Sequence, residues 1–373
     1  MTRILMLLLA LGLAGACSTG DGSNPFDEEE EQDAGDGGDD GGDDGGDGGD
    51  DGQPGQPIQS DRTLPPGTAN PAPDSAIFRR EAFDAEKGAG YAESISYDST
   101  ADLFYVDNLA FDGDNAYTRD DERPSLDTAP AGGRADAGRF AVYENVNPIL
   151  DPLNTEPIDQ LPHKAIYAVS QSGATEFAII RTGAYINYGF GGFVYQRNGT
   201  DAAGNPVSVT LPTEGQASYR GEYAGLRDFE NRSGLEYVTG DMRMAIDFED
   251  FNDPTGVRGE ITNRRVYDAF TNDEITSDLV TALNDDGGSF TQLPTLLFRV
   301  GPGVLDENGE ITGEAFSTDV TSTQVEEYEG GNYYAVLSGP NAEEVVGIVV
   351  VESEDPRFTG VTARETGGFI ATR

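Results

Sequence analysis

Cysteine, histidine and tryptophan are nearly absent from this chain of 373 residues, which has one cysteine, one histidine and no tryptophan. A single cysteine excludes an internal disulfide bond. It also excludes zinc sites built from several cysteines, and His163 alone cannot supply a site built from several histidines. The sequence therefore predicts no metal and no other cofactor.

Basic residues are also scarce, because 23 Lys and Arg stand against 68 Asp and Glu, a formal net charge of -45. Such a chain repels phosphate, so nucleic acid is not expected as a partner, and anionic lipid headgroups are disfavoured. Two interpretations of the acidic surplus stay open. It favours cationic partners, and it is equally typical of adaptation to salt, which screens surface carboxylates.

The common motifs of catalysis are missing as well. The sequence has no Gly-x-Ser-x-Gly elbow and no Gly-x-x-x-x-Gly-Lys-Ser/Thr loop for phosphate. His163 follows Pro162 in a polar stretch, which favours a surface or structural role over a catalytic triad. Among 68 acidic residues, chance pairs of carboxylates are unavoidable and do not support glycoside hydrolysis. We therefore expect that the protein is not an enzyme.

Residues 1–16 have the pattern of a signal peptide. Arg3 precedes an apolar run at residues 4–13, which is too short to span a bilayer stably. The small residues Ala14-Gly15-Ala16 stand before Cys17 and resemble the lipobox of bacterial lipoproteins. That resemblance implies cleavage before Cys17 and lipid attachment to it. The alternative is cleavage by ordinary signal peptidase, which would release a soluble periplasmic protein.

Residues 17–76 are expected to form a disordered acidic tether. Residues 35–52 are almost purely Gly and Asp, and residues 53–73 are rich in Pro and Gly. Low hydrophobicity and high charge leave nothing to offset the entropy of ordering, and about 58 such residues reach roughly 40 Å as a random coil. A calcium-binding β-roll needs an apolar residue in each repeat, so a solvated spacer is favoured over calcium binding. Ser18 after the cysteine resembles lipoproteins that are sorted to the outer membrane.

Residues 77–214 carry short aromatic and branched runs between turn residues, which predict a β-rich domain. The runs are Leu103–Asp107, Phe140–Glu144, Lys164–Val169 and Glu176–Ile180. The densest aromatic stretch follows them and has two interpretations: an exposed binding surface, or ordinary packing beside glycine bends. The candidate binding residues in this stretch are Tyr185, Tyr188, Phe190, Phe193 and Tyr195.

Residues 215–373 predict an eight-stranded antiparallel barrel. Met242, Met244, Ile246 and Phe248 alternate with charged residues, as expected of a strand with one buried face. Asp306–Gly309 has the composition of a hairpin turn, and the same is true of residues 253–256. A helix is expected where Ile275, Leu279, Val280 and Leu283 recur at helical spacing. The eight strands are expected at Ser218–Gly225, Asp241–Phe248, Val257–Tyr267, Thr295–Val300, Glu310–Thr318, Asn332–Ser338, Glu344–Val351 and Gly368–Thr372.

The third of these strands indicates whether the barrel lies in water or in a membrane. Alternation along it predicts that Arg258, Glu260 and Arg264 share the outer face. Charged side chains on that face cannot contact lipid, so we expect a water-soluble barrel and not a membrane pore.

Two segments of this region resemble a known family. Gly221-Glu-Tyr-Ala-Gly225 and Gly339-Pro-Asn-Ala-Glu-Glu344 are similar to parts of the C-terminal barrel of transferrin-binding protein B, a barrel shared by factor H binding protein. The resemblance implies an all-β protein in which a handle-like domain, residues 77–214, precedes the soluble barrel of residues 215–373. The usual family motif has aromatics directly before the second segment and more glycines after it, whereas here Val346 replaces one such glycine.

The same resemblance implies a function. It suggests an outer-membrane lipoprotein that faces the periplasm or the cell surface and binds a protein or solute without catalysis, as in iron capture. The expected partners are that ligand, an outer-membrane transporter and the membrane itself, through the lipid anchor. The alternative is a structural or interaction lipoprotein of the envelope that binds no solute.

Overall fold

The computed structural model describes residues 63–107, 109, 116–120, 126, 140–145, 149–150, 153–154, 156–158, 161–183, 187–249, 257–299, 304–320 and 325–373. All of them belong to the unit Gly52–Arg373. The predicted signal peptide, Cys17 and the tether up to residue 62 lie outside the described residues, as does the turn expected at residues 253–256.

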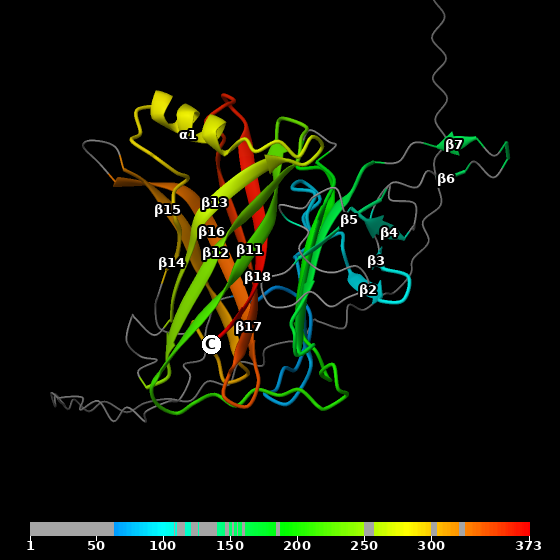
Figure 1. Cartoon of the computed structure of the whole chain (residues 1–373), viewed down its shortest axis with the longest axis vertical. Coiled ribbons are helices and arrows are strands. Elements are labelled where there is room, and N and C mark those ends of the chain that lie inside the picture. The colour runs from blue at the N-terminus through cyan, green and yellow to red at the C-terminus, as the bar shows by residue number, and fades with distance from the viewer. Residues whose placement is uncertain are drawn as a thin grey trace, which may run out of the picture. The chain divides into compact units, whose positions relative to one another are not determined.

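The first half of the described chain forms an eight-stranded antiparallel sheet, whose order is β1-β10-β9-β8-β5-β4-β3-β2. We call it the curled sheet (Figure 1). A separate small sheet pairs β6 (Ile149–Leu150) with β7 (Pro157–Ile158). The strands of the curled sheet are β1 (Ile77–Arg80), β2 (Ser94–Asp98), β3 (Leu103–Asp107), β4 (Tyr117–Arg119), β5 (Ala141–Glu144), β8 (Lys164–Val169), β9 (Thr175–Arg181) and β10 (Gly191–Arg197).

The second half forms a closed barrel in which each strand pairs with the next and β11 pairs with β18. The one helix among the described residues, α1 (Thr276–Asp285), lies at one end of the barrel (Figure 1). Its Leu279 and Leu283 are buried in the barrel core. The barrel strands are β11 (Gln216–Glu230), β12 (Glu236–Asp247), β13 (Val257–Asp268), β14 (Leu296–Phe298), β15 (Glu310–Val320), β16 (Val325–Ser338), β17 (Glu344–Glu354) and β18 (Thr362–Thr372).

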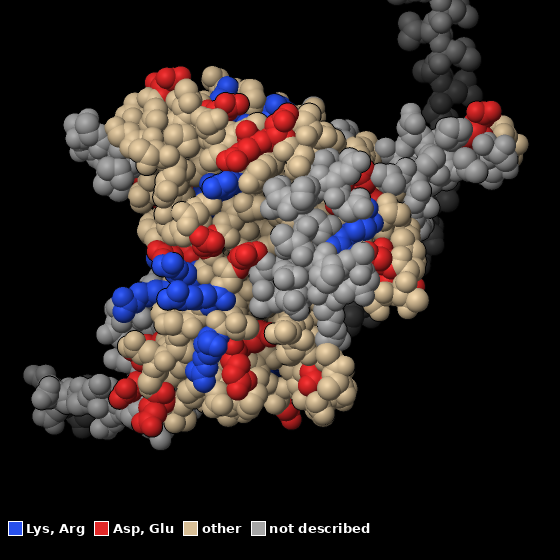
Figure 2. Space-filling view, viewed as in Figure 1, with Lys and Arg blue, Asp and Glu red and all other residues tan. Residues whose placement is uncertain are grey.

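The predicted fold class is confirmed, since a β-rich sheet precedes a closed eight-stranded antiparallel barrel. All eight expected barrel strands and the helix are present. On β12, Met242, Met244 and Ile246 are buried while Asp241 and Arg243 are exposed, as their alternation predicts. Charged side chains on this outer surface are visible in Figure 2.

Strand β18 explains how the two halves of the described chain meet. It is buried on both faces along nearly its whole length. Phe369 belongs to the barrel core, whereas Ile370 belongs to the apolar cluster shared with the curled sheet. Gly368 lies under the ring of Phe177 from β9, so that a Cβ at Gly368 would come within 2.3 Å of that ring. A glycine at this position therefore lets the sheet approach the barrel closely.

Buried arginines of the sheet donate hydrogen bonds to the barrel across the same interface. Arg79 of β1 donates two hydrogen bonds to Glu310 of β15, at 2.7 and 2.8 Å. Arg181 of β9 is fully buried and donates to Thr366 of β18 at 2.9 Å. These bonds fix the orientation of the sheet on the barrel, because a buried guanidinium that loses its partner is costly.

The folded body begins earlier than the sequence predicts. Residues 63–76 were expected to belong to the disordered tether, yet the structure describes them against β1 and β10. Thr68 pairs with Phe78, and the buried Arg197 donates to the carbonyls of Ala72 and Ser75. Composition alone could not show this, since Arg197, which bonds to Ala72 and Ser75, lies more than 100 positions along the chain.

Candidate functional site

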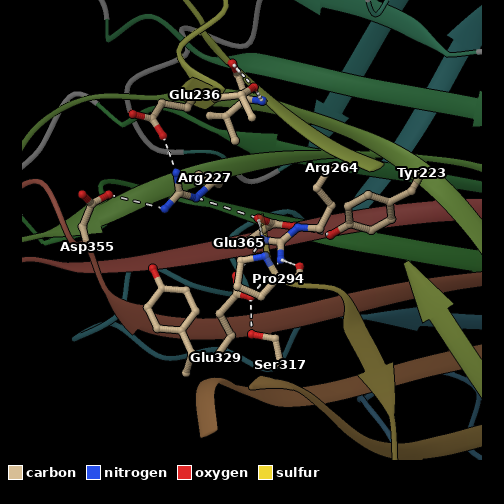
Figure 3. A network of polar contacts seen from close by, with 12 residues as sticks. Tyr223, Arg227, Glu236, Arg264, Pro294, Ser317, Glu329, Asp355 and Glu365 are labelled. Carbon is tan, nitrogen blue, oxygen red and sulfur yellow. Dashed lines mark hydrogen bonds and ion pairs between the residues drawn. The ribbon is translucent and has the colours of Figure 1, made fainter. Parts of the chain in front are cut away.

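The interior of the barrel is filled by its own side chains. One part is apolar and includes Phe298, Tyr333 and Phe369, with the first two rings stacked at 4.2 Å. Another part holds a buried network of charged groups, shown in Figure 3. A large ligand must therefore bind outside the barrel, as eight-stranded barrels lead one to expect.

Arg264 of β13 lies at the centre of this network. Its guanidinium donates two hydrogen bonds to Glu329, at 2.8 and 2.6 Å, and one to Glu365 at 2.6 Å. Tyr223 and Ser317 complete the hydrogen bonding of the two carboxylates (Figure 3). Burial by itself lowers the pKa of Arg264, but Glu329 and Glu365 outweigh it and hold that pKa well above its usual value.

A second cluster adjoins the first. Arg227 of β11 donates to Glu236 at 2.6 Å and lies 3.8 Å from Glu365. Arg357 pairs with Asp355 at 2.7 Å and with Glu236 at 2.8 Å. The charges are matched closely enough that each arginine stays ionised, which is typical of a structural network and not of an acid–base catalyst.

The position of Arg264 corrects one prediction. Alternation along β13 placed Arg264 on the outer face with Arg258 and Glu260, but its side chain is buried inside the barrel. The register between β12 and β13 shifts between Thr239 and Asp241, and Asn263 has a positive φ of 54°. This bulge adds one residue, so every later side chain of β13 changes face.

The predicted aromatic binding surface is also corrected. Tyr188, Phe193 and Tyr195 are buried, so they cannot serve as exposed anchors. Phe193 stacks on Tyr334 of the barrel, and the guanidinium of Arg364 lies 4.4 Å from the ring of Tyr188. These rings therefore pack between sheet and barrel. This is the second of the two interpretations, ordinary packing of aromatic side chains beside glycine bends. The remaining two are Phe190, which is half-buried against Tyr91, and Tyr185, which lies outside the described residues.

The curled sheet carries a different aromatic cluster on its other face. The rings of Tyr97, Phe104, Tyr143 and Tyr167 come from β2, β3, β5 and β8. Tyr167 lies 5.4 Å from Tyr97 and 5.3 Å from Phe104, while Phe104 stacks on Tyr143 at 5.5 Å. Asp102 accepts hydrogen bonds from the hydroxyls of Tyr97 and Tyr143, at 2.9 and 2.7 Å.

A pocket of about 640 Å³ opens beside this cluster, and we call it the tyrosine pocket. Glu176 accepts a 2.6 Å hydrogen bond from Tyr167 and another from Gln196, which holds its carboxylate at the wall. Asp201 orders the adjoining loop by accepting from the backbone N–H groups of Ala203 and Asn205. The pocket is lined by Tyr97, Ser99, Tyr167, Val169, Gly173, Glu176, Asn198, Gly199, Thr200 and Asp201.

The tyrosine pocket combines two tyrosine side chains with acidic oxygens. Its volume lies within the range of ligand sites in proteins, roughly 300–1,000 Å³. A cation is attracted both by the ring faces and by the carboxylates of Glu176 and Asp201. The arrangement suits a guanidinium, ammonium or hydroxylated group. No local pattern predicts this site, because Tyr97 and Tyr167 are 70 positions apart.

His163 has a structural role, one of the two that its sequence context favoured. It is fully buried, and its Nδ1–H donates to the carbonyl of Leu161 at 3.0 Å. Among the described residues, Nε2 has no hydrogen-bond partner. Burial therefore lowers the pKa of His163 to about 4, and the bond to Leu161 opposes this only in part.

Stability should depend on this histidine in acid. The folded-state pKa lies below the unfolded value of about 6.5, so its contribution is complete above pH 6.5 and is lost as pH falls toward 4. We expect wild type to lose about 2 to 3 kcal/mol between pH 7 and pH 4.5 through His163 alone. His163→Asn keeps an N–H for Leu161 but cannot be protonated. Between the two pH values its free energy of unfolding in urea should fall by about 2 to 3 kcal/mol less than that of wild type. An identical acid loss in both proteins would contradict this assignment.

In the described part of the chain, no group of three His, Cys, Asp or Glu side chains is arranged to hold a metal ion. Asp306–Gly309 forms the predicted hairpin turn, in which Asp306 accepts from the backbone N–H groups of Asn308 and Glu310. None of the described helices is long and apolar enough to cross a bilayer.

The fold thus defines a class, in which a curled antiparallel sheet packs on a closed eight-stranded barrel. The chain is similar in structure to transferrin-binding protein B, as its barrel segments predicted. It matches a double mutant of that vaccine antigen from Haemophilus parasuis Hp5 at 13% identity, over 66% of this chain and 41% of that chain, with a TM-score of 0.31. A single mutant matches at 14% identity, over 57% and 36%, with a TM-score of 0.30. Intact Ap-TbpB (N and C lobes) matches at 13% identity, over 72% and 44%, with a TM-score of 0.31.

No family model and no curated protein sequence matches the chain. The chain spans about two fifths of the length of the solved structures that it matches. At this identity the likeness concerns the fold alone.

Proposed function

We propose that the protein is a non-catalytic binding lipoprotein of the outer membrane and that the tyrosine pocket receives a cationic group of its ligand. The observation that supports this most is the combination in one pocket of the Tyr97 and Tyr167 rings with the Glu176 carboxylate. The net charge of -45 raises the local concentration of cationic solutes and of basic protein surfaces around the chain.

The anchor and setting are part of the same proposal. Cys17 carries the lipid, and the tether holds the folded body away from the membrane, where a ligand is accessible. The resemblance of the barrel segments to transferrin-binding protein B supports nutrient capture, with iron reaching the cell through a bound partner. An outer-membrane transporter is then a further partner, which takes over what the lipoprotein has bound.

The pocket can be tested with a fluorescein-labelled peptide of alternating Arg and Ser, in 0.3 M salt to screen the general acidic field. We expect Tyr97→Ala/Glu176→Gln to weaken binding about tenfold or more, since a desolvated cation–π contact contributes about 2 kcal/mol and a tenfold change needs about 1.4. The matched control is Tyr105→Ala/Glu93→Gln, which removes an exposed tyrosine and an exposed carboxylate outside the pocket.

Two results would count against the pocket. In the first, the control double variant weakens binding as much as the pocket variant, which would mean that charge alone attracts the peptide. In the second, neither variant changes binding, which would favour the alternative of an envelope protein without a solute ligand. Circular dichroism of all proteins shows whether the sheet is intact.

A further inference from the structure

Arginines gather on the outer face of the first barrel strands. Arg220, Arg243, Arg258 and Arg299 come from β11, from β12, from β13 and from the residue after β14, and all four line one groove of about 600 Å³. We call this surface the arginine face. Figure 2 shows basic side chains gathered on the lower left of the barrel. The chain has only 23 basic residues, so the grouping of four is unexpected.

The arrangement of the four arginines is unfavourable for the barrel itself. Arg220 and Arg243 are direct cross-strand partners. Gly259 pairs with Phe298, so the next residues outward, Arg258 and Arg299, also face each other. Like charges in such positions destabilise a sheet. The barrel therefore gains no stability from these pairs, which points to a role outside folding.

Two of the four guanidinium groups are available to pair with carboxylates of a partner. Arg243 lies 3.9 Å from Glu260, and Arg299 lies 3.3 Å from Glu314 and 3.0 Å from Glu327. Among the described residues, no carboxylate lies within 4.0 Å of Arg220 or Arg258, and both side chains are exposed. A chain with 68 acidic residues could readily pair them.

The groove also has an apolar part. Leu297 and Phe316 are cross-strand partners, and both are half-buried at its floor. The guanidinium of Arg299 lies 4.6 Å from the ring of Phe316. Arginine beside aromatic and aliphatic side chains is the composition of a protein–protein contact and of its most important residues.

The borders of the arginine face limit the size of the anion. Asp241 and Asp247 of β12 lie on the same side of the strand as Arg243. They are six positions apart along the strand, which is roughly 20 Å. A duplex nucleic acid or an anionic membrane would extend past these carboxylates and be repelled. A compact group of carboxylates would fit between them.

We propose that the arginine face is a docking surface for a protein partner that presents two or more carboxylates beside an apolar side chain. The carboxylates pair with Arg220 and Arg258, and the apolar side chain covers Leu297 and Phe316. This surface does not include the tyrosine pocket, so its test is independent of the function proposed above.

The probe is a fluorescein-labelled peptide of alternating Glu and Leu, titrated with the detergent-solubilised full chain. We expect Arg220→Glu/Arg258→Glu to weaken binding at least tenfold, and higher salt to weaken binding to wild type. The matched control Arg80→Glu/Arg265→Glu changes the net charge equally at two paired arginines elsewhere, and it should weaken binding less than twofold. The melting temperature of Arg220→Glu/Arg258→Glu should equal or exceed that of wild type, because opposite charges replace like ones.

Four outcomes would overturn the proposal. The control variant could weaken binding as strongly, or a Gln and Leu peptide could bind wild type as tightly. Phosphatidylglycerol vesicles or tripolyphosphate could bind in a way that depends on Arg220 and Arg258 while the Glu and Leu peptide does not, which would assign the face to lipid or phosphate. If Arg220→Glu/Arg258→Glu melts lower than wild type, the neutral variant Arg220→Gln/Arg258→Gln decides, and its unchanged binding would equally overturn the proposal.

Discussion

Replacing Cys17 by serine is expected to move the protein from the membrane fraction to the soluble fraction. Serine cannot form the thioether that carries the lipid, and Cys17 is the one cysteine of the chain. Each buried methylene contributes about 0.8 kcal/mol to membrane binding. One acyl chain binds only weakly, whereas the two or three chains that the lipobox resemblance implies give stable anchoring.

The measurement is fractionation of cells that express wild type or Cys17→Ser, with an alkaline wash to remove peripheral proteins. Ser18→Ala is the matched control, since it changes the neighbouring residue and keeps the thiol. Wild type should also enter a detergent phase that the serine variant does not enter. A serine variant that stays with the membrane after washing would refute the anchor, and so would a wild type that is soluble without detergent.

Arg264→Met is expected to lower the free energy of unfolding by about 3 to 5 kcal/mol, because it leaves the buried carboxylate of Glu329 without its paired cation and removes the nearer of the two cations beside Glu365. The exposed neighbour Arg265 is the matched position. Arg265→Met should cost at most about 1 kcal/mol, since its pair with Glu274 is a surface pair at 3.7 Å. Urea unfolding of the three proteins measures both effects.

The pH dependence separates lost charge from lost packing. In wild type, burial raises the pKa of Glu329, but Arg264 outweighs burial and lowers it, so stability is lost as pH falls through that lowered pKa. Without Arg264 the folded-state pKa of Glu329 should rise above its unfolded value. Relative to wild type, the variant should then recover stability as pH falls from 7 to 5, because the Glu329 carboxylate of its folded state binds a proton that wild type does not bind. If the difference in free energy of unfolding between wild type and Arg264→Met stays constant over this range, lost packing alone explains it.

Much of the barrel could be predicted because its signals are local. The alternation of Met242, Met244 and Ile246 with charged residues requires a strand with one buried face, whatever surrounds it. Asp306–Gly309 forms its turn through hydrogen bonds within five residues. Such features depend on neighbours in the sequence, so the sequence is enough to find them.

The candidate site could not be found in the same way. Alternation shows which side chains share a face, but not which element covers that face. Tyr195 and Tyr167 both come from aromatic strands, and the structure buries the first between sheet and barrel and lines a pocket with the second. The difference arises because the sheet curls and packs on β16, β17 and β18, contacts that join distant parts of the chain.

The sequence by itself determined the charge of the chain, which is a sum over its residues. It also determined the signal-like N-terminus with Cys17 and the positions of the barrel strands, because each of these follows from residues within one short segment. Only the tertiary structure decided the face of Arg264, the burial of Tyr188, and the meeting of Arg220 with Arg258 in one groove. A single bulge reverses the parity of a strand, and the packing of one sheet on another decides which face meets water.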